Sequence, residues 1–270
     1  MVLPYDPRMT RTRRLADLRA PEVAGAIGER SIVVLPLGAT EQHGPHLPFS
    51  TDLVVAQASA EAVVDRYGDE HDLWVLPPLA FTRSTEHAWS AGTVWLSAQT
   101  MLSVLGDIGR SLATAGVRKL AFVNAHGGNS SLLNVACRDL RLAHGFETFL
   151  LHPFLPPDHG GGTRGAPAGE LGMGIHAGYD ETSMLLHLRP DLVDMSVAEA
   201  NVPTKLAENK HVRFGGSVSF GWLSNDFGAN GVIGDPTGAN AEHGAAMFDL
   251  AVDMLGEAFG EISRFQYPMR

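Results

Sequence analysis

Residues 31–52 read SIVVLPLGATEQHGPHLPFSTD. The apolar, largely β-branched run at 31–37 predicts a buried strand, and Gly38 predicts a turn at its carboxyl end. Open α/β sheets bind their ligands just beyond the carboxyl ends of the strands. The loop after the predicted strand carries four potential metal ligands, which are Glu41, His43, His46 and Asp52. Carboxylates and imidazoles gathered on a proline-stiffened loop are typical of a metal site.

Asp52 has two interpretations at this point. Apolar residues recur at helical spacing over 53–67, so Asp52 lies just before the N-terminus of a predicted helix. A carboxylate in that place is a favourable helix cap. It is also placed to return toward Glu41 and His43 and to share a cation with either of them. Those two residues are two positions apart, so an extended segment projects both side chains from one face.

A second strand, loop and helix repeat this arrangement. They are predicted at residues 119–123, 124–129 and 130–144, and the loop reads NAHGGN. This places His126 at the carboxyl end of a strand. Further along, His176 and Glu181 open another helical run. If the strands are parallel and helices return between them, all three loops open at the same sheet edge, and their potential ligands converge.

The remaining elements fit an α/β fold with a mainly parallel sheet. Further strands are predicted at 73–76 and 148–152, further helices at 97–115 and 240–259, and a hairpin at 214–220. No internal repeat, low-complexity tract or linker interrupts the sequence. Residues 1–270 are therefore expected to form a single domain, with residues 1–25 as an N-terminal arm of the kind that often packs on a neighbouring subunit.

Composition and charge exclude several classes of protein. The formal net charge is −10 and the isoelectric point about 5.6, which argues against a nucleic-acid or anionic-membrane surface. The basic cluster at 11–14 is interpreted as part of a solvated arm. A single cysteine, Cys137, excludes an intrachain disulfide and suits a reducing cytoplasm. No apolar run approaches the ~18 residues of a membrane span, so the chain is expected to be cytoplasmic.

The mixture of ligand types narrows the metal chemistry. Imidazole with carboxylate, and no thiolate, suits Zn, Mn or Fe(II). An all-oxygen Ca or Mg site would not need histidine. More ligands than one cation requires, several of them carboxylates able to bridge, predict two divalent metal ions about 3.5–4 Å apart. Hydrolysis by a metal-activated water is the natural chemistry of such a pair.

Four motifs in this order resemble the creatininase (creatinine amidohydrolase) family. They are LGATEQHGPHLP at 37–48 with Thr51-Asp52, NAHGGN at 124–129, HAG at 176–178 with ETS at 181–183, and Gly234-Asp235-Pro236. The resemblance spans about residues 30 to 260. It implies a three-layer α/β sandwich with a mainly parallel central sheet, a homohexamer, and a binuclear metal site that hydrolyses a C–N amide bond outside ordinary peptides.

The resemblance also implies roles for individual residues. Glu41 and His126 resemble ligands of one metal, His43 a ligand of the other, and Asp52 the bridge between them. In creatininase itself a glutamate lies two residues beyond the histidine of the second motif, whereas this chain has Gly128 there. In this respect the chain resembles other branches of the family, which share the His-Gly-Gly-Asn form, and that resemblance implies that Glu181 of the ETS motif supplies the missing carboxylate to the second metal. The departure argues against creatinine as the substrate.

Catalytic and pocket residues are expected beside the metals. A proton must reach the leaving nitrogen, and His176 is the candidate shuttle because imidazole titrates near neutral pH. Its alternatives are a metal ligand or a residue that orients Glu181, which is itself a catalytic candidate. Candidate substrate-binding residues are Glu86, His87, Trp89, Trp222 and Asp235. Burial in the core is the alternative for the tryptophans.

The resulting functional prediction is a metal-dependent amidohydrolase acting on a small cyclic or formyl amide. Within the family, a formylamino-pyrimidine or the C-terminal dipeptide of a mycofactocin precursor is an alternative substrate, the latter making the protein a peptidase. A member of the fold that binds metal or ligand without catalysis is the second class. A one-metal lyase or isomerase is the third, and it differs from a hydrolase because hydrolysis adds one water to the product.

Overall fold

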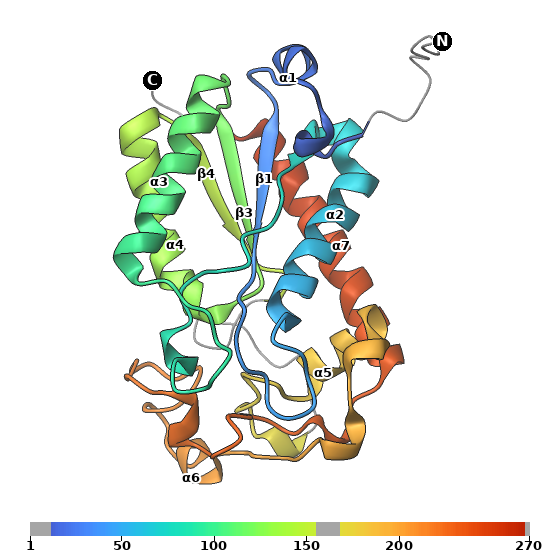
Figure 1. Ribbon diagram of the computed structural model, residues 1–270, viewed down its shortest axis with the longest axis vertical. Helices are drawn as coiled ribbons and strands as arrows, with labels where there is room; N and C mark the ends of the chain where they lie inside the picture. Colours follow the sequence, from blue (N-terminus) through green and yellow to red (C-terminus); the bar gives the residue numbers. More distant parts are fainter. Residues whose placement is uncertain (1–11, 155–167, 268–270) are drawn as a thin grey trace.

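A computed structural model describes residues 12–154 and 168–267. Its centre is a sheet of four parallel strands in the order β2-β1-β3-β4 (Figure 1). The strands are β1 (Ile32–Leu37), β2 (Leu73–Val75), β3 (Lys119–Asn124) and β4 (Glu147–Leu151). The register of the two central strands pairs Leu37 with Asn124, so β1 and β3 end side by side. The loops that follow them therefore start from neighbouring points.

Helices cover both faces of the sheet, as Figure 1 shows, and the three-layer α/β prediction is confirmed. One layer contains α3 (Ala98–Thr114) and α4 (Ser130–His144), and the other contains α2 (Thr51–His71) and α7 (Ala241–Arg264). Alternate residues of β1 enter the two cores. Val33 and Leu35 pack with the α3 and α4 side, whereas Ile32 and Val34 pack with the α2 and α7 side. Burial on both faces explains the uninterrupted apolar run of this strand.

The rest of the described chain is built from short elements. Three helices complete the fold: α1 (Ala20–Ala26), α5 (Tyr179–Leu188) and α6 (Thr204–Ala207). The 3-10 turns include η1 (Leu15–Asp17), η2 (Thr85–His87), η3 (Gly127–Asn129), η5 (Ala168–Glu170), η6 (Pro190–Leu192), η7 (Met195–Val197), η8 (Ser224–Asp226) and η9 (Pro236–Gly238). Among the described residues, no helix combines the length and apolarity needed to cross a membrane.

The hairpin predicted at 214–220 is wrong. No residue of that stretch is in a strand. Phe214 instead packs its ring against Phe220, Trp222 and Phe227, with ring centroids 5.4 to 5.6 Å away. Aromatic residues that mimicked a strand pattern therefore form a small cluster of their own, separate from the cores that flank the sheet.

The described part of the N-terminal arm packs on its own chain. The guanidinium of Arg13 pairs with Asp69 at 2.7 Å and Asp72 at 2.8 Å, and it lies over the ring of Trp74. The backbone of Val75 donates to the Arg13 carbonyl at the edge of β2. The interpretation of the basic cluster as solvated is therefore wrong at Arg13. Residues 1–11 lie outside the described residues, and the single-domain organisation stays a prediction.

Candidate metal centre

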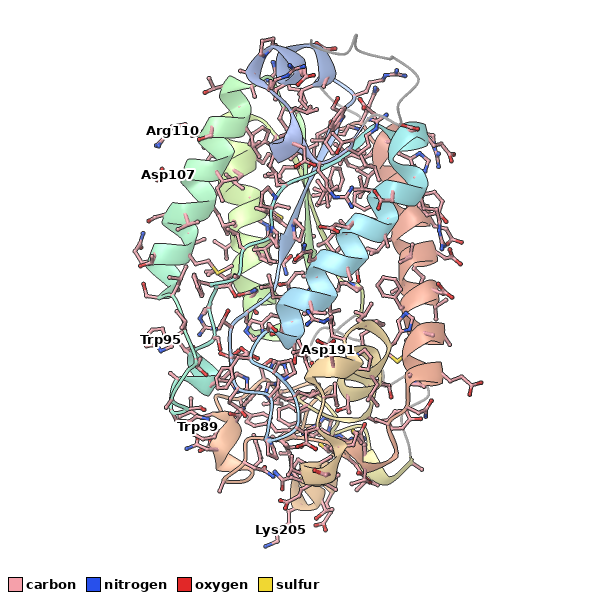
Figure 2. All side chains as sticks on the ribbon, turned by 45° about the vertical axis from the view of Figure 1, so that its right-hand side comes forward. Trp89, Trp95, Asp107, Arg110, Asp191 and Lys205 are labelled. Carbon is pink, nitrogen blue, oxygen red and sulfur yellow. The ribbon has the colours of Figure 1, made fainter. Side chains whose placement is uncertain are left out.

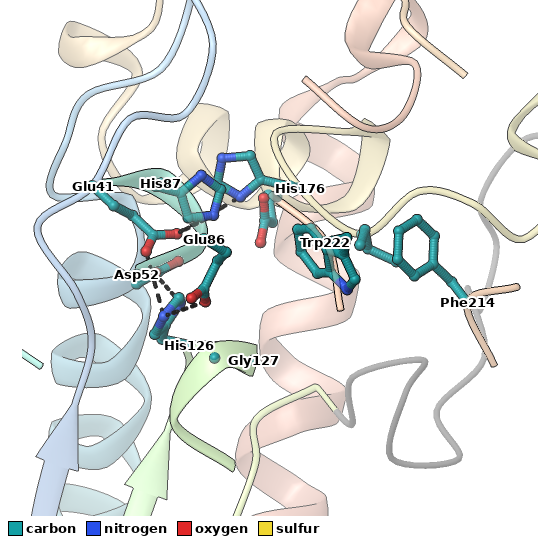
Figure 3. Close-up of a pocket in the computed structure, with 12 residues that line it drawn as sticks. Glu41, Asp52, Glu86, His87, His126, Gly127, His176, Phe214 and Trp222 are labelled. Carbon is teal, nitrogen blue, oxygen red and sulfur yellow. Dashed lines mark ion pairs between the residues drawn. The ribbon is translucent and has the colours of Figure 1, made fainter. Parts of the chain in front are cut away.

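Five predicted ligands meet beyond the carboxyl ends of the central strands. Figure 3 shows Glu41, Asp52 and His126 among them. Glu41 and His43 lie on the loop after β1, and Asp52 lies in the first turn of α2. His126 follows β3, and Glu181 lies in the first turn of α5. Four of them, Glu41, Asp52, His126 and Glu181, line a cavity of about 90 Å³. Parallel strands and short loops thus bring together side chains that are up to 140 positions apart in sequence.

The two carboxylate oxygens of Asp52 face different imidazoles. Oδ1 lies 3.1 Å from Nε2 of His43, and Oδ2 lies 3.1 Å from Nδ1 of His126. Ligand atoms on a tetrahedral ion with bonds of about 2.0–2.1 Å lie about 3.4 Å apart, close to both separations. Oδ2 is buried and makes no hydrogen bond. The carboxylate engages these imidazoles, which favours the bridging interpretation of Asp52 over the helix cap.

The ligands form two groups that share Asp52. The first subsite consists of Glu41, Asp52 and His126, and the second subsite consists of His43, Asp52 and Glu181. Within each group, one ligand atom per residue lies within 4.8 Å of the others. The donor set of imidazole nitrogen and carboxylate oxygen fits Zn, Mn or Fe(II).

Second contacts hold the ligands in place. Nδ1 of His43 donates to the backbone carbonyl of Glu41 at 3.2 Å, which leaves Nε2 directed at the carboxylates. Such a bond fixes the tautomer and ring orientation of metal-binding histidines. The hydroxyl of Ser84 donates to Oε2 of Glu41 at 2.5 Å, and the backbone N–H of Ala177 donates to Glu181 at 2.6 Å.

The electrostatics of the centre call for a cation. Burial raises the pKa of Glu41 to about 8, and partial removal from water raises that of the half-buried Glu181 to about 7. Burial alone would lower the pKa of His43, but the carboxylates of Asp52, Glu181 and Glu41 raise it to about 10. Without metal, protons therefore supply the positive charge that balances the carboxylates. A divalent cation would displace them.

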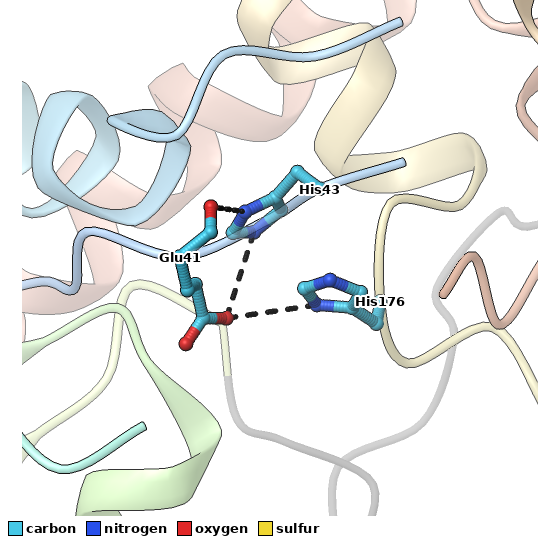
Figure 4. A group of neighbouring side chains, drawn as sticks. All are labelled: Glu41, His43 and His176. Atoms are coloured by element: carbon cyan, nitrogen blue, oxygen red, sulfur yellow. Dashed lines mark hydrogen bonds and ion pairs between the residues drawn. The ribbon is translucent and has the colours of Figure 1, made fainter. Parts of the chain in front are cut away.

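His176 joins the centre from the loop before α5 (Figure 4). Its ring centroid lies 4.3 Å from that of His43, and its Nδ1 lies 3.7 Å from Oε1 of Glu41. Glu41, His43 and His176 form a further group with metal-binding spacing. Burial and the neighbouring histidines lower the pKa of His176 well below its usual value, which keeps the ring neutral.

Glu86 brings another carboxylate into the cavity from η2. Its Oε1 lies 3.3 Å from Nε2 of His126. A side chain at Gly128 would collide with this carboxylate, so Glu86 occupies the space that residue 128 would need. Position 128 is where this chain has a glycine and creatininase a glutamate. In this chain a carboxylate from a different loop, that of Glu86, takes that space.

The other predicted pocket residues have different places. Glu86, His87 and Trp222 line the cavity, together with Phe214 and Ile175. Trp89 lies at the outer surface with Trp95 (Figure 2), and its indole N–H donates to Ser224 at 2.7 Å. Asp235 is absent from the lining residues, and its carboxylate instead accepts from the backbone N–H and hydroxyl of Thr237.

Sequence reasoning missed Glu170. This buried carboxylate accepts hydrogen bonds from the backbone N–H groups of Tyr179 at 3.0 Å and Asp235 at 2.7 Å. Glycines at 174, 178 and 234 surround it, and a Cβ at any of them would collide with it. Glu170 therefore ties the loop that carries His176 to the turn before η9. Its position within a glycine-rich stretch offered no signal beyond the glycines themselves.

A model of the creatininase family, described as creatinine amidohydrolase, matches residues 16–259. The chain belongs to the creatininase family. It is 36% identical over 239 residues to the mycofactocin precursor peptide peptidase of Mycobacterium ulcerans (strain Agy99). The aligned region covers 86% of this chain and 85% of that relative. This chain is 33% identical over 178 residues to the creatinine amidohydrolase of Pseudomonas putida, covering 61% and 66% of the two chains.

A solved structure supports the same assignment. The crystal structure of creatinine amidohydrolase (creatininase) superimposes with a TM-score of 0.74 at 25% identity, covering 95% of this chain and 100% of that one. The predicted family and fold are thereby confirmed. Membership of a family of amidohydrolases supports a hydrolytic function in general terms.

Proposed function

We propose that this protein is a hydrolase that cleaves a C–N amide bond with the help of two divalent metal ions, drawn from Zn, Mn and Fe. The observation that carries the proposal is the placement of Asp52, whose two oxygens each face a different ligand group. Oδ2, which makes no hydrogen bond, and the carboxylates of Glu41 and Glu181 beside it fit such a pair of cations. Bound there, the metal ions would polarise the amide carbonyl and lower the pKa of a water molecule.

The remaining steps fall to side chains of this chain. Nδ1 of His176 points toward Glu41, at the edge of both subsites, and is placed to take a proton from the attacking water. The same atom then returns the proton to the leaving nitrogen as the C–N bond breaks. Trp222 and Phe214 form an apolar wall opposite the carboxylates, which positions the amide and excludes bulk water (Figure 3).

Two substrate classes are proposed. A cavity of about 90 Å³ with an apolar wall suits a small cyclic or formyl amide. The second class is a peptide like the precursor named for the Mycobacterium ulcerans relative, which matches this chain over 86% of its length. In a peptide, only the residues on either side of the scissile bond would enter the cavity.

Metal analysis followed by a substrate panel tests the proposal. Protein stripped with a chelator is reloaded with Zn, Mn or Fe(II), and bound metal is counted per chain. The reloaded protein is then offered creatinine, cyclic amides, formamides and a synthetic mycofactocin precursor peptide, and products are analysed by mass. We expect two metal ions per chain and a product mass increased by one water.

Other outcomes would contradict the proposal. Metal binding without turnover of any amide would indicate a non-catalytic binding protein. Turnover without added water would indicate a lyase or isomerase. Arg110→Ala is a suitable control, because Arg110 pairs with Asp107 on the outer side of α3, away from the cavity (Figure 2). Its metal content and turnover should match those of the unmodified protein.

A further inference from the structure

Gln42 lies between the first two ligands of the motif and contacts two histidines of the cavity. The side chain is buried, with its amide nitrogen 2.8 Å from Nδ1 of His87 and 3.1 Å from Nε2 of His176. Gly231, which has a φ of +72°, leaves room for it. A Cβ at that glycine would lie 2.5 to 2.7 Å from the Gln42 amide. The fold thus builds a fitted space for this amide.

One hydrogen bond decides which way the Gln42 amide points. The backbone N–H of Gly44 donates to a side-chain atom of Gln42 at 2.9 Å, so that atom must be the oxygen. The NH₂ group therefore faces His87. Because an amide nitrogen only donates, Nδ1 of His87 must accept, and the proton of the ring lies on Nε2. If both nitrogens of the His87 ring were protonated, the N–H at Nδ1 would face the N–H of the Gln42 amide at 2.8 Å, and neither could accept.

The backbone carbonyl of Gln42 determines which ring nitrogen of His176 carries the proton. Nε2 of His176 lies 2.7 Å from the carbonyl oxygen of Gln42, which only accepts, so Nε2 carries the proton and does not accept from the Gln42 amide. The second N–H of that amide instead has the hydroxyl of Ser224 at 3.4 Å and the carbonyl of Gly231 at 3.5 Å as acceptors. Nδ1 of His176 then carries a lone pair, directed toward Oε1 of Glu41. The two rings stack with centroids 4.1 Å apart. One residue therefore holds two stacked imidazoles that present a donor and an acceptor to the same cavity.

We propose that Gln42 is a positioning residue that fixes His87 with its proton on Nε2, which makes His87 a hydrogen-bond donor to the substrate's carbonyl oxygen. This N–H reaches toward Oε1 of Glu41 at 3.3 Å, on the cavity wall. During attack, the water oxygen forms a bond to the carbonyl carbon while its proton passes to Nδ1 of His176. Negative charge develops on the carbonyl oxygen, and the N–H of His87 stabilises it without transferring its proton.

The consequence for catalysis rests on the proposed function, but the tautomer does not. It is measured in protein selectively labelled with ¹⁵N-histidine, loaded with Zn, by long-range ¹H–¹⁵N correlation spectra. His87→Gln and His176→Gln identify the two rings by their missing signals. We expect both rings of the unmodified protein in the neutral form with the proton on Nε2. Finding the His87 proton on Nδ1 would overturn the proposal without recourse to any Gln42 variant.

Variants of Gln42 then test its role. A carboxylate only accepts, so Gln42→Glu should move the His87 proton to Nδ1, and Gln42→Met should leave the ring as a mixture of tautomers. On an amide that the protein hydrolyses, we expect Gln42→Met to lower kcat about 100-fold with a small change in KM. Gln57→Glu, on the exposed face of α2, is the matched control and should change neither measurement.

The outcomes separate the inference from the proposed function. An unchanged kcat in Gln42→Met, with two metal ions still bound, would overturn the role of Gln42 and leave amide hydrolysis intact. If no amide is hydrolysed although the His87 tautomer responds to Gln42→Glu as expected, the tautomer assignment stands and the proposed function fails.

Discussion

The two subsites of the proposed metal centre are built from different kinds of structure. In the first subsite Glu41, Asp52 and His126 are 1%, 3% and 5% exposed, and they follow the two central strands or begin α2. The second subsite depends on Glu181, whose side chain is 32% exposed and lies on α5, outside the sheet. Rigid, buried ligands need little reorganisation to bind an ion. The comparison therefore teaches that the first subsite should hold its cation more tightly than the second.

Replacing the residue shared by both subsites should have the largest effect. Asp52→Asn keeps the size of the side chain but removes its charge, so neither cation retains a bridging carboxylate. We expect metal content to fall from two ions per chain to near zero, and activity to fall by more than about 1000-fold. Metal analysis and single-substrate kinetics measure both. Asp65→Asn, an exposed carboxylate on the same helix, is the control.

If Asp52→Asn keeps two ions, the carboxylate is no bridge. Asp52 would then have only the role of a carboxylate at the N-terminus of α2, where it stabilises the helix. That outcome would remove the observation on which the proposed function depends.

Replacing one ligand in each subsite tests directly whether the first subsite binds its cation more tightly than the second. Glu181→Gln should leave one tightly held ion in the first subsite, whereas Glu41→Gln should leave at most one weakly held ion in the second. The expected difference in affinity of the remaining ion is at least about tenfold, measured by competition with a metallochromic chelator. Asp180→Asn is the control for Glu181, since that neighbouring carboxylate pairs with His243 away from the cavity. Equal affinities would contradict the ranking.

The same division governs what the sequence could predict. The strands β1 and β3 are buried on both faces, so their apolar runs stand out, and the ligands that follow them lie at a predictable edge. Asp52 and His126 are predicted as ligands on this ground, and the structure places both at that edge. The parallel direction of the strands was predicted, but their order β2-β1-β3-β4 was not.

The opposite wall of the cavity was predicted at Trp222 but not at Phe214. Phe214 and Trp222 come from a segment without strands or long helices, where packing among aromatic rings replaces any periodic pattern. The role of Gln42 could not be predicted from sequence. It depends on the orientation of the side-chain amide, which only the hydrogen bond from the backbone N–H of Gly44 reveals. Asp235 was expected in the pocket, but its residue type suits the turn that it closes equally well.

Glu170 supports only the less rigid side of the centre. Glu170→Ala leaves the N–H groups of Tyr179 and Asp235 without their acceptor and loosens the start of α5. We expect the affinity for the second cation to fall about 10-fold to 100-fold, as for other residues that orient metal ligands, with the first cation unaffected. Isothermal titration of metal-free protein resolves the two events. Glu242→Ala, an exposed position on α7, is the control, and equal loss at both subsites would show that Glu170 acts on the whole fold.

Protons should compete with the metal ions, with an effect of about tenfold per pH unit for each proton displaced. Partial removal from water raises the pKa of Glu181 to about 7, full burial raises that of Glu41 to about 8, and nearby carboxylates raise the pKa of His43 to about 10. Groups with raised pKa values hold protons as the pH falls, and a ligand must lose its proton to bind metal. Metal affinity should therefore rise from pH 6 to pH 8.

Calorimetry in buffers of different ionisation enthalpy counts the protons released in that pH range. His43 is still protonated at pH 8 in the metal-free protein, so binding in the second subsite should release at least one proton across the whole range. The buried carboxylate Glu41 gives the first subsite its steepest dependence below pH 8. Affinities that do not change with pH would mean that the imidazoles and carboxylates are not the ligands, because metal binding would then release no protons.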